Sequence, residues 1–195
     1  MRITGGKARG INLILPGKGE IRPATDYIRE AVFSSLGNLP EDARVLDVFA
    51  GTGAYALEAI SRGAKSACLV DKNAAATAAQ KKNIAQILKA LGTAGTTNLP
   101  KIECRTLDLF KAAQHALPVC DLIFCDPPWA LWQKTETAKL VEFLTTLIDP
   151  ATDWARIILE APAGFDVPVP NNWQIVKIIG KKGKDQPQAS VLAKI

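Results

Sequence analysis

The sequence has few residues of the kinds that bind metals or act as catalytic pairs. It contains a single histidine, His115, and four cysteines without any Cys-x-x-Cys spacing, Cys68, Cys104, Cys120 and Cys125. That spacing is typical of zinc and redox sites, and a catalytic histidine needs partners that no pattern around His115 supplies. The sequence therefore predicts no metal site, no histidine-based catalysis and reduced cysteines in a cytoplasmic protein.

Long apolar runs are also missing. No stretch approaches the roughly 18 apolar residues that cross a membrane, and the first residues, Met-Arg-Ile-Thr-Gly-Gly-Lys, lack the apolar core of a secretory signal. Hydrophobic residues nevertheless make up 48% of the 195 residues, which excludes a disordered chain and predicts a single globular protein, most simply a monomer.

Positive charge is unevenly distributed. The net charge is +5, and basic residues crowd the first thirty positions and residues 177–184. This distribution fits an ordinary basic surface as well as contact with a polyanion, so charge alone does not decide between them.

Residues 45–54, Val-Leu-Asp-Val-Phe-Ala-Gly-Thr-Gly-Ala, are the most informative stretch. An apolar segment leads into two glycines, and the helical spacing of Ala54, Leu57 and Ile60 follows. This order predicts a buried strand, a tight turn and a helix. Glycine lets the backbone approach a ligand closely, and the helix start offers N–H groups to it.

Apolar strands and helices alternate along the rest of the chain. Further strands are expected at residues 66–71, 101–107, 121–126, 156–160, 174–179 and 189–193. Helices are expected from Thr25 or Asp26 to about Gly37, at 74–91 and at 137–148. This pattern predicts an α/β fold with a seven-stranded, mostly parallel sheet, an antiparallel edge hairpin and a loop at 180–187. Residues 2–14 predict an N-terminal β-hairpin, so 1–38 is expected to be an extension of a main domain at 39–195.

Four predicted strands end in an acidic residue: Asp47, Asp71, Asp108 and Asp126. The carboxyl ends of parallel strands meet at one edge, where ligands of such folds bind. Asp47 lies four residues before the first glycine and would repel a pyrophosphate, so it favours a ligand with a cationic amine or sulfonium. Asp71 is spaced to accept two ribose hydroxyls, and Asp108 to accept an adenine amino group with Leu109 and Phe110 beside the ring.

These motifs resemble those of class I S-adenosylmethionine-dependent methyltransferases. The resemblance lies in Asp47-Val-Phe-Ala-Gly-Thr-Gly53, the two following strand-end acids and Asp126-Pro-Pro-Trp129, a tetrapeptide similar to that of amino-methyltransferases acting on nucleobases. Arg2-Ile-x-Gly-Gly-Lys-x-Arg-Gly10 and Arg22-Pro-x-Thr-Asp-x-x-Arg-Glu30 are similar to the RsmD family, which methylates N2 of a guanine in small-subunit ribosomal RNA. The chain departs from that family where Trp129 replaces Phe or Tyr and where Gly183-Lys-Asp-Gln186 replaces Tyr-Gly-Asp-Thr.

The resemblance implies a Rossmann-like methyltransferase that uses S-adenosylmethionine and acts on ribosomal RNA, within the small subunit or an assembly intermediate. It implies cofactor contacts by Thr25, Asp47, Phe49, Ala50, Gly51, Gly53, Asp71, Lys72, Asp108 and Leu109. It implies catalysis by Asp126, Pro127, Pro128 and Trp129, and RNA contacts by Arg9, Arg22, Arg29, Lys181 and Lys182. Phe49 also fits a core position, and Thr25 also fits a helix cap.

The tetrapeptide suits methylation of an exocyclic amine. The Asp126 carboxylate and the Pro127 carbonyl can accept the two N–H groups of a guanine amine, and Trp129 can stack on the base. Two alternatives stay open, a DNA amino-methyltransferase acting on adenine N6 or cytosine N4 and a catalytically silent RNA-binding or assembly module. A NAD-dependent oxidoreductase is disfavoured, because no hydride-transfer site is found.

Overall fold

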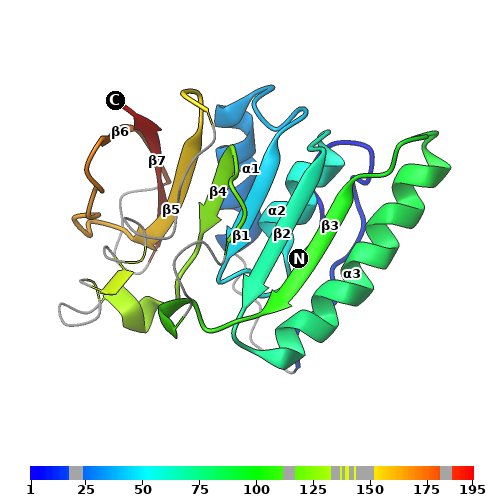
Figure 1. The fold of residues 1–195 in the computed structure, drawn as a ribbon, viewed down its shortest axis with the longest axis horizontal. Coiled ribbons are helices and arrows are strands. Elements are labelled where there is room, and N and C mark those ends of the chain that lie inside the picture. The colour runs from blue at the N-terminus through cyan, green and yellow to red at the C-terminus, as the bar shows by residue number, and fades with distance from the viewer. Residues whose placement is uncertain are drawn as a thin grey trace.

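A central sheet of seven strands organises the computed structural model, in the order β3-β2-β1-β4-β5-β7-β6 (Figure 1). The structure describes residues 1–17, 24–111, 117–132, 137, 139–140, 143, 152–180 and 186–195. For residues 24 and 25 it describes the backbone alone. The strands are β1 (Arg44–Val48), β2 (Ser66–Asp71), β3 (Lys101–Thr106), β4 (Leu122–Cys125), β5 (Arg156–Pro162), β6 (Trp173–Ile179) and β7 (Pro187–Lys194). Strands β1 to β5 pair in parallel, whereas β7 pairs antiparallel with β5 and β6. The predicted α/β fold is confirmed.

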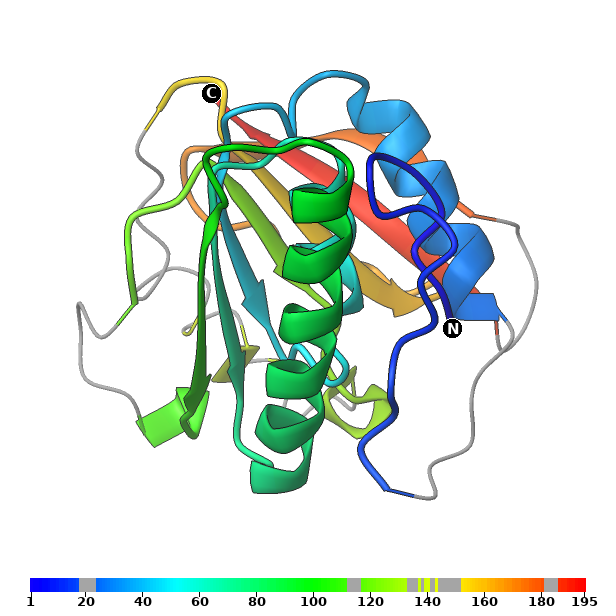
Figure 2. The same cartoon turned by 90° about the vertical axis from the view of Figure 1, so that its right-hand side faces the viewer.

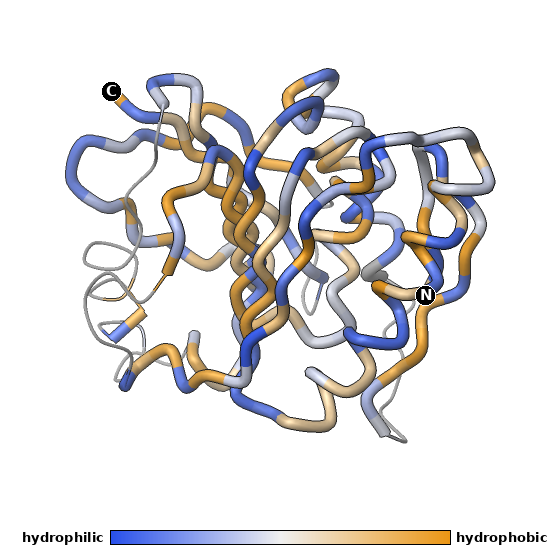
Figure 3. The backbone as a smooth tube through the Cα atoms, turned by 45° about the vertical axis from the view of Figure 1, so that its right-hand side comes forward, coloured by the Kyte–Doolittle hydropathy of each residue, from blue (hydrophilic) through white to orange (hydrophobic). Residues whose placement is uncertain are grey.

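Helices α1 (Ala24–Leu36), α2 (Ala54–Ser61) and α3 (Ala74–Thr93) cover one face of the sheet, with the N-terminal segment between α1 and α3 (Figure 2). The other face packs against the short helices η1 (Leu109–Lys111) and η2 (Trp129–Trp132). Successive strand residues serve opposite faces, as β geometry requires. The central strands are therefore mainly hydrophobic (Figure 3).

Few predicted elements need revision. Helix α1 begins at Ala24, α3 extends to Thr93, and β7 runs over 187–194. Of the helix predicted at 137–148, the structure describes Thr137, Lys139, Leu140 and Phe143 as helical, and the rest lies outside the described residues.

The N-terminal segment turns back on itself with a single β-bridge, between Arg2 and Asn12, instead of the two predicted strands. Backbone bonds between its two arms run from Ile3 N to Ile11 O and from Gly10 N to Ile3 O (both 2.9 Å). Other N–H groups bond to α2: Thr4 N donates to Glu58 Oε2 (2.7 Å), and Lys7 N donates to Ser61 O (2.8 Å). The segment is therefore a hairpin-like turn without two full strands, and it lies along α2, which supplies partners to some of its N–H groups.

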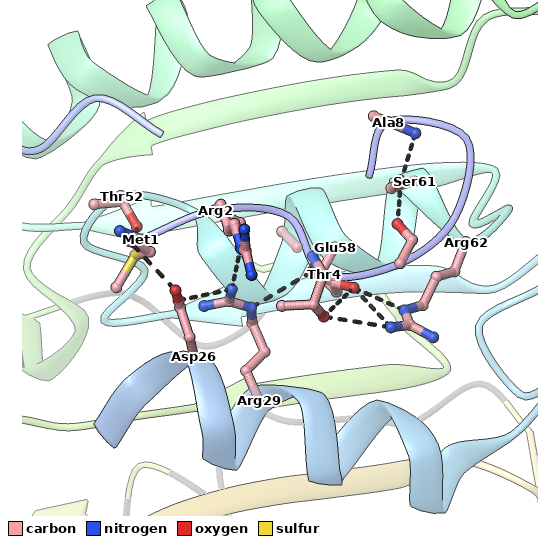
Figure 4. Close-up of polar contacts among 12 residues, drawn as sticks. Met1, Arg2, Thr4, Ala8, Asp26, Arg29, Thr52, Glu58, Ser61 and Arg62 are labelled. Carbon is pink, nitrogen blue, oxygen red and sulfur yellow. Dashed lines mark hydrogen bonds and ion pairs between the residues drawn. The ribbon is translucent and has the colours of Figure 1, made fainter. Parts of the chain in front are cut away.

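A buried ion cluster joins this segment to α1 and α2 (Figure 4). Glu58 and Arg29 are 0% and 1% exposed. Arg29 Nη2 donates to the Arg2 carbonyl and to Asp26 Oδ1 (3.0 Å), and its Nε lies 3.6 Å from Glu58 Oε2. The predicted RNA contact by Arg29 is thus corrected, since its charge is neutralised in the interior and cannot reach a polyanion.

Replacing Arg29 should therefore lower the stability of the fold. We expect Arg29→Met to lower the free energy of unfolding by about 3 kcal/mol, because the Arg2 carbonyl and Asp26 would lose their donor and Glu58 would keep Arg62 as its remaining counter-ion. Guanidinium unfolding monitored by fluorescence would measure this. The matched control is Arg2→Met, whose side chain is exposed and whose removal should change stability by less than about 0.5 kcal/mol. Equal stability of both variants would contradict the assignment.

Candidate active site

The loop between β1 and α2 has a left-handed backbone at three positions, Phe49 (φ 59°), Gly51 (φ 51°) and Gly53 (φ 80°). A Cβ added to Gly53 would lie 2.3 Å from Leu69 Cδ2, so this glycine permits packing on β2. A Cβ added to Gly51 would meet no atom within 4 Å. The backbone of Gly51 thus borders open space, where a ligand can approach it closely.

Asp71 anchors the loop from the end of β2. Its Oδ2 accepts a hydrogen bond from Gly51 N (2.8 Å), and its Oδ1 accepts one from Asn73 N (2.8 Å). On the other side, Gln80 Nε2 donates to Gly51 O (3.0 Å). Hydrogen bonds from two elements therefore hold the loop in this conformation. Lys72, which follows, is exposed.

Asp47 lies beneath the loop. It is 2% exposed, and its Oδ2 accepts a hydrogen bond from Ala56 N (3.0 Å) in the first turn of α2. The cap residue Gly53 has no side chain, so Asp47 supplies the acceptor that a capping side chain would normally provide. Burial, together with the charges of Asp126 and Asp71, raises the pKa of the Asp47 carboxyl well above its usual range. Sequence reasoning placed this carboxylate against a cationic ligand, whereas the structure directs it to the helix.

Asp108 follows β3, and the loop that carries it bonds to β2 through Leu107 N and Asp71 O (3.0 Å). Sequence reasoning expected Leu109 and Phe110 beside an adenine ring. Leu109 is instead 3% exposed and belongs to the core, while Phe110 is 40% exposed. A short apolar run does not reveal which of two neighbours faces outward.

Three aromatic rings meet beside this strand end. The ring centroids of Phe49 and Phe110 are 6.0 Å apart, and each lies 6.2 Å from that of Phe143. Phe49 thus joins an aromatic cluster next to Asp108. Phe143 was not among the residues that the sequence predicted for the site.

The Asp126-Pro-Pro-Trp129 tetrapeptide follows β4, the strand next to β1 at the point where strand order reverses. Asp126 is partly exposed, and its charge raises the pKa of both Asp47 and Tyr55, so it lies near both. Pro127 is buried, and Pro128 starts η2 by accepting a hydrogen bond from Leu131 N (2.8 Å). The indole of Trp129 packs partly against the core. This is the site at which the fold class predicts a ligand.

Two buried residues of this region were missed by sequence reasoning. Tyr55 Oη donates a hydrogen bond to Glu160 Oε2 (2.8 Å), and the two side chains are 8% and 4% exposed. Glu160 is a further acid near the end of an apolar strand. The same criterion, an acid at a strand end, selected Asp47 and Asp126 and could have selected Glu160. Nothing in the sequence pairs it with Tyr55.

The remaining predicted site residues are scattered. Ala50 is buried in the loop, and Arg9 is exposed near the end of α2 that is remote from the loop. Arg22, Lys181 and Lys182 lie outside the described residues, as do His115 and the side chain of Thr25.

The described surface also has two clefts away from the sheet edge that carries these acids. One, of about 710 Å³, lies where β1 and β2 begin and includes Lys7, Arg62 and Lys65. The other, of about 670 Å³, lies between the N-terminal segment and α3 and includes Lys7, Asn12, Gln86 and Lys89. Among the described residues, no group of three or more His, Cys, Asp or Glu side chains could hold a metal, and no helix is both long and apolar enough to cross a bilayer.

Residues 1–185 match the protein family described as Conserved hypothetical protein 95. The chain belongs to this family. Ribosomal RNA small subunit methyltransferase D of Escherichia coli (strain K12) is 34% identical over 176 residues, which cover 90% of this chain and 82% of that protein. The protein of the same name from Buchnera aphidicola (subsp. Baizongia pistaciae) is 29% identical over 91% of this chain and 85% of its own.

A solved structure is also similar along its whole length. The putative methyltransferase yhhF from Escherichia coli is 28% identical with a TM-score of 0.72, over 100% of this chain and 97% of that chain. The family resemblance seen in the sequence and the prediction of a methyltransferase enzyme are thus both confirmed.

The pKa of Asp47 predicts a pH dependence of stability. As the pH rises above about 4, the carboxyl ionises in the unfolded chain while the folded protein keeps its proton, so ionisation favours unfolding up to the raised folded pKa. We expect the free energy of unfolding of Asp47→Asn, relative to the parent, to increase from about pH 4 towards neutrality. Urea unfolding across this range would measure it.

Asp121 provides a control of opposite sign. Its carboxylate accepts hydrogen bonds from Arg44 N, Nε and Nη2 (2.9, 3.0 and 2.9 Å), and Arg44 lowers its pKa. The stabilisation that the Asp121 carboxylate gives the fold is fully present above the pKa of this group in the unfolded chain. It is lost as the pH falls through the lower pKa of the folded protein. The loss in free energy of unfolding caused by Asp121→Asn should therefore become smaller at acidic pH. A pH-independent difference for Asp47→Asn would contradict the burial argument.

Proposed function

We propose that this protein transfers a methyl group from S-adenosylmethionine to the exocyclic N2 amine of a guanine in small-subunit ribosomal RNA. The observation that carries the proposal is the position of Asp126-Pro127 at the end of β4, directly beside the strand that leads into the glycine loop. Donor and acceptor sites thereby share one edge of the sheet. The names of the relatives point to ribosomal RNA as the substrate.

The loop and its neighbours fit S-adenosylmethionine. The open space at Gly51 accommodates a ligand against the backbone, and Asp71 and Asp108 end adjacent strands, as ribose and adenine recognition requires. Phe49 and Phe110 offer apolar surface beside them. When bound, S-adenosylmethionine supplies a methyl group activated by its sulfonium charge.

Asp126 and Pro127 prepare the amine. The lone pair of a guanine amine is delocalised into the ring, which makes the amine a poor nucleophile. Acceptance of its two N–H groups by a carboxylate and a carbonyl favours a pyramidal nitrogen with its lone pair free for transfer. Pro127 and Pro128 restrict the backbone, so the acceptors need little rearrangement. Asp126 can then take the proton that the methylated amine releases.

Trp129 and the basic surface bind the RNA. Stacking of the target base on Trp129 would contribute about 1–3 kcal/mol. The cleft between the N-terminal segment and α3 presents Lys7 and Lys89 with amide and hydroxyl groups and no acidic residue, which suits a phosphate backbone. Arg9, Arg22, Lys181 and Lys182 are proposed as further contacts. The protein would act as a cytoplasmic monomer on the small subunit or an assembly intermediate.

Substitution of Asp126 tests the proposed chemistry. We expect Asp126→Ala to lower methyl transfer to ribosomal RNA at least about 100-fold, because the amine loses an acceptor in the transition state. Affinity for S-adenosylmethionine, measured by calorimetry, should stay within about threefold. Mass spectrometry of nucleosides from treated, unmodified RNA should identify N2-methylguanosine. Transfer to adenine or cytosine in duplex DNA, with none to ribosomal RNA, would favour a DNA amino-methyltransferase instead.

The basic cleft predicts a salt dependence. Each lysine that neutralises a phosphate contributes about 0.7–0.9 to the slope of log affinity against log salt concentration. We expect Lys7→Gln/Lys89→Gln to reduce that slope by about 1.5 in RNA-binding titrations. The control Lys177→Gln/Lys194→Gln removes the same charge from β6 and β7, at the other side of the sheet, and should leave the slope nearly unchanged. Equal slopes for the two variants would show that the cleft with Lys7 and Lys89 does not contact RNA phosphates.

A further inference from the structure

Methyl transfer requires two parts of this protein to be held at a fixed separation. The donor part is the glycine loop with the first turn of α2, and the acceptor part is the end of β4 with Asp126 and Pro127. An error of about 1 Å in such a separation can cost about 100-fold in rate. The strands hold the two parts side by side in the sheet, but both lie beyond the strand ends, where the backbone ladder no longer constrains them.

Tyr55 belongs to the donor part through its backbone. It is the second residue of α2, between the glycine loop and Ala56, whose N–H is held by Asp47. Any displacement of Tyr55 therefore moves the start of the helix and the loop with it.

The side chain of Tyr55 belongs to the acceptor part. Its ring stacks on that of Phe124, with centroids 4.9 Å apart and planes inclined by 20°, and Phe124 lies two residues before Asp126. Its hydroxyl donates to Glu160 in β5, next to β4 in the sheet. Since Cys125 pairs with Leu159, Glu160 lies at the level at which Asp126 leaves β4.

The hydroxyl is kept as a hydrogen-bond donor. Burial and the charges of Glu160 and Asp126 raise the pKa of the Tyr55 phenol well above its usual range, so it retains its proton at neutral pH. Glu160, being almost wholly buried, has little access to water as a competing partner. Both conditions make a persistent hydrogen bond.

We propose that Tyr55 and Glu160 are positioning residues that hold the end of β4 at a fixed distance from the glycine loop. Their hydrogen bond joins α2 to β5 across the end of β4, so it determines where Asp126 and Pro127 sit relative to the methyl donor. This role rests on the proposed function, because it concerns the alignment of donor and acceptor. Neither residue touches the reacting atoms.

Single substitutions separate this role from one that depends on the charge of Glu160. We expect Tyr55→Phe and Glu160→Ala each to lower kcat for RNA methylation roughly tenfold, with KM for RNA and affinity for S-adenosylmethionine within about twofold. Glu160→Gln retains an oxygen that accepts from Tyr55, so it should recover most of the turnover that Glu160→Ala loses. Loss of turnover in Glu160→Gln equal to that in Glu160→Ala would overturn the proposal.

A double variant separates positioning from stability. Tyr55→Phe removes the phenol donor from a buried carboxylate, which destabilises the fold, whereas Tyr55→Phe/Glu160→Leu replaces both members of the pair with apolar groups of similar size. The double variant should recover thermal stability while kcat stays roughly tenfold low. Recovery of kcat together with stability would show a structural role only. Ser61→Ala removes a buried hydroxyl bonded to Ala8 N (2.9 Å) at the other end of α2, and should cost stability without changing kcat.

Hydrogen exchange gives a readout that does not need the reaction. In the protein without ligand, amide exchange in residues 51–56 and 124–131 should rise several-fold together in Tyr55→Phe and Glu160→Ala, and much less in Glu160→Gln. Faster exchange in only one of these segments would overturn the proposal. If the parent protein bound S-adenosylmethionine but methylated no RNA, the proposed function would fail, and the exchange data would still decide whether the pair couples the two segments.

Discussion

The backbone conformation of residues 49–53 is the constraint on which the rest of the structure depends. Three positions in this short loop have positive φ, one of them Phe49, a residue type that rarely adopts it. Such a conformation persists only where the surroundings impose it. Here Asp71 and Gln80 hold the peptide groups of Gly51 from two elements, and Asp47 holds the start of the following helix. The protein's own hydrogen bonds therefore impose this loop conformation.

Helix α2 transmits this constraint to the rest of the molecule. Its first turn is held by Asp47, and its second half is held by the N-terminal segment through Glu58 and Ser61. The buried pair of Glu58 and Arg29 then connects α2 to α1. Residues that are far apart in the chain thus share one core, and the segment predicted as an extension packs as part of it.

Carboxylates at one edge of the sheet have different tasks because their surroundings differ. Asp71 binds backbone N–H groups of the loop, Asp47 caps a helix, and Glu160 accepts from a phenol. Asp126 and Asp108 are partly exposed, and Asp108 also accepts a hydrogen bond from Phe110 N (3.2 Å). The burial of each acid and the donors around it, and not the residue type, therefore determine its structural task.

The order of strands and helices along the chain, the glycine turn and the acids at one sheet edge could be predicted from the sequence alone. These follow from local periodicity and from the parallel connections that it implies, so neighbouring residues suffice to predict them. The burial of Arg29, the exposure of Phe110 rather than Leu109, and the contact of Tyr55 with Glu160 became visible in the folded chain alone. Those properties depend on contacts between residues distant in the chain, and charge or hydropathy at a single position carries no record of its partner.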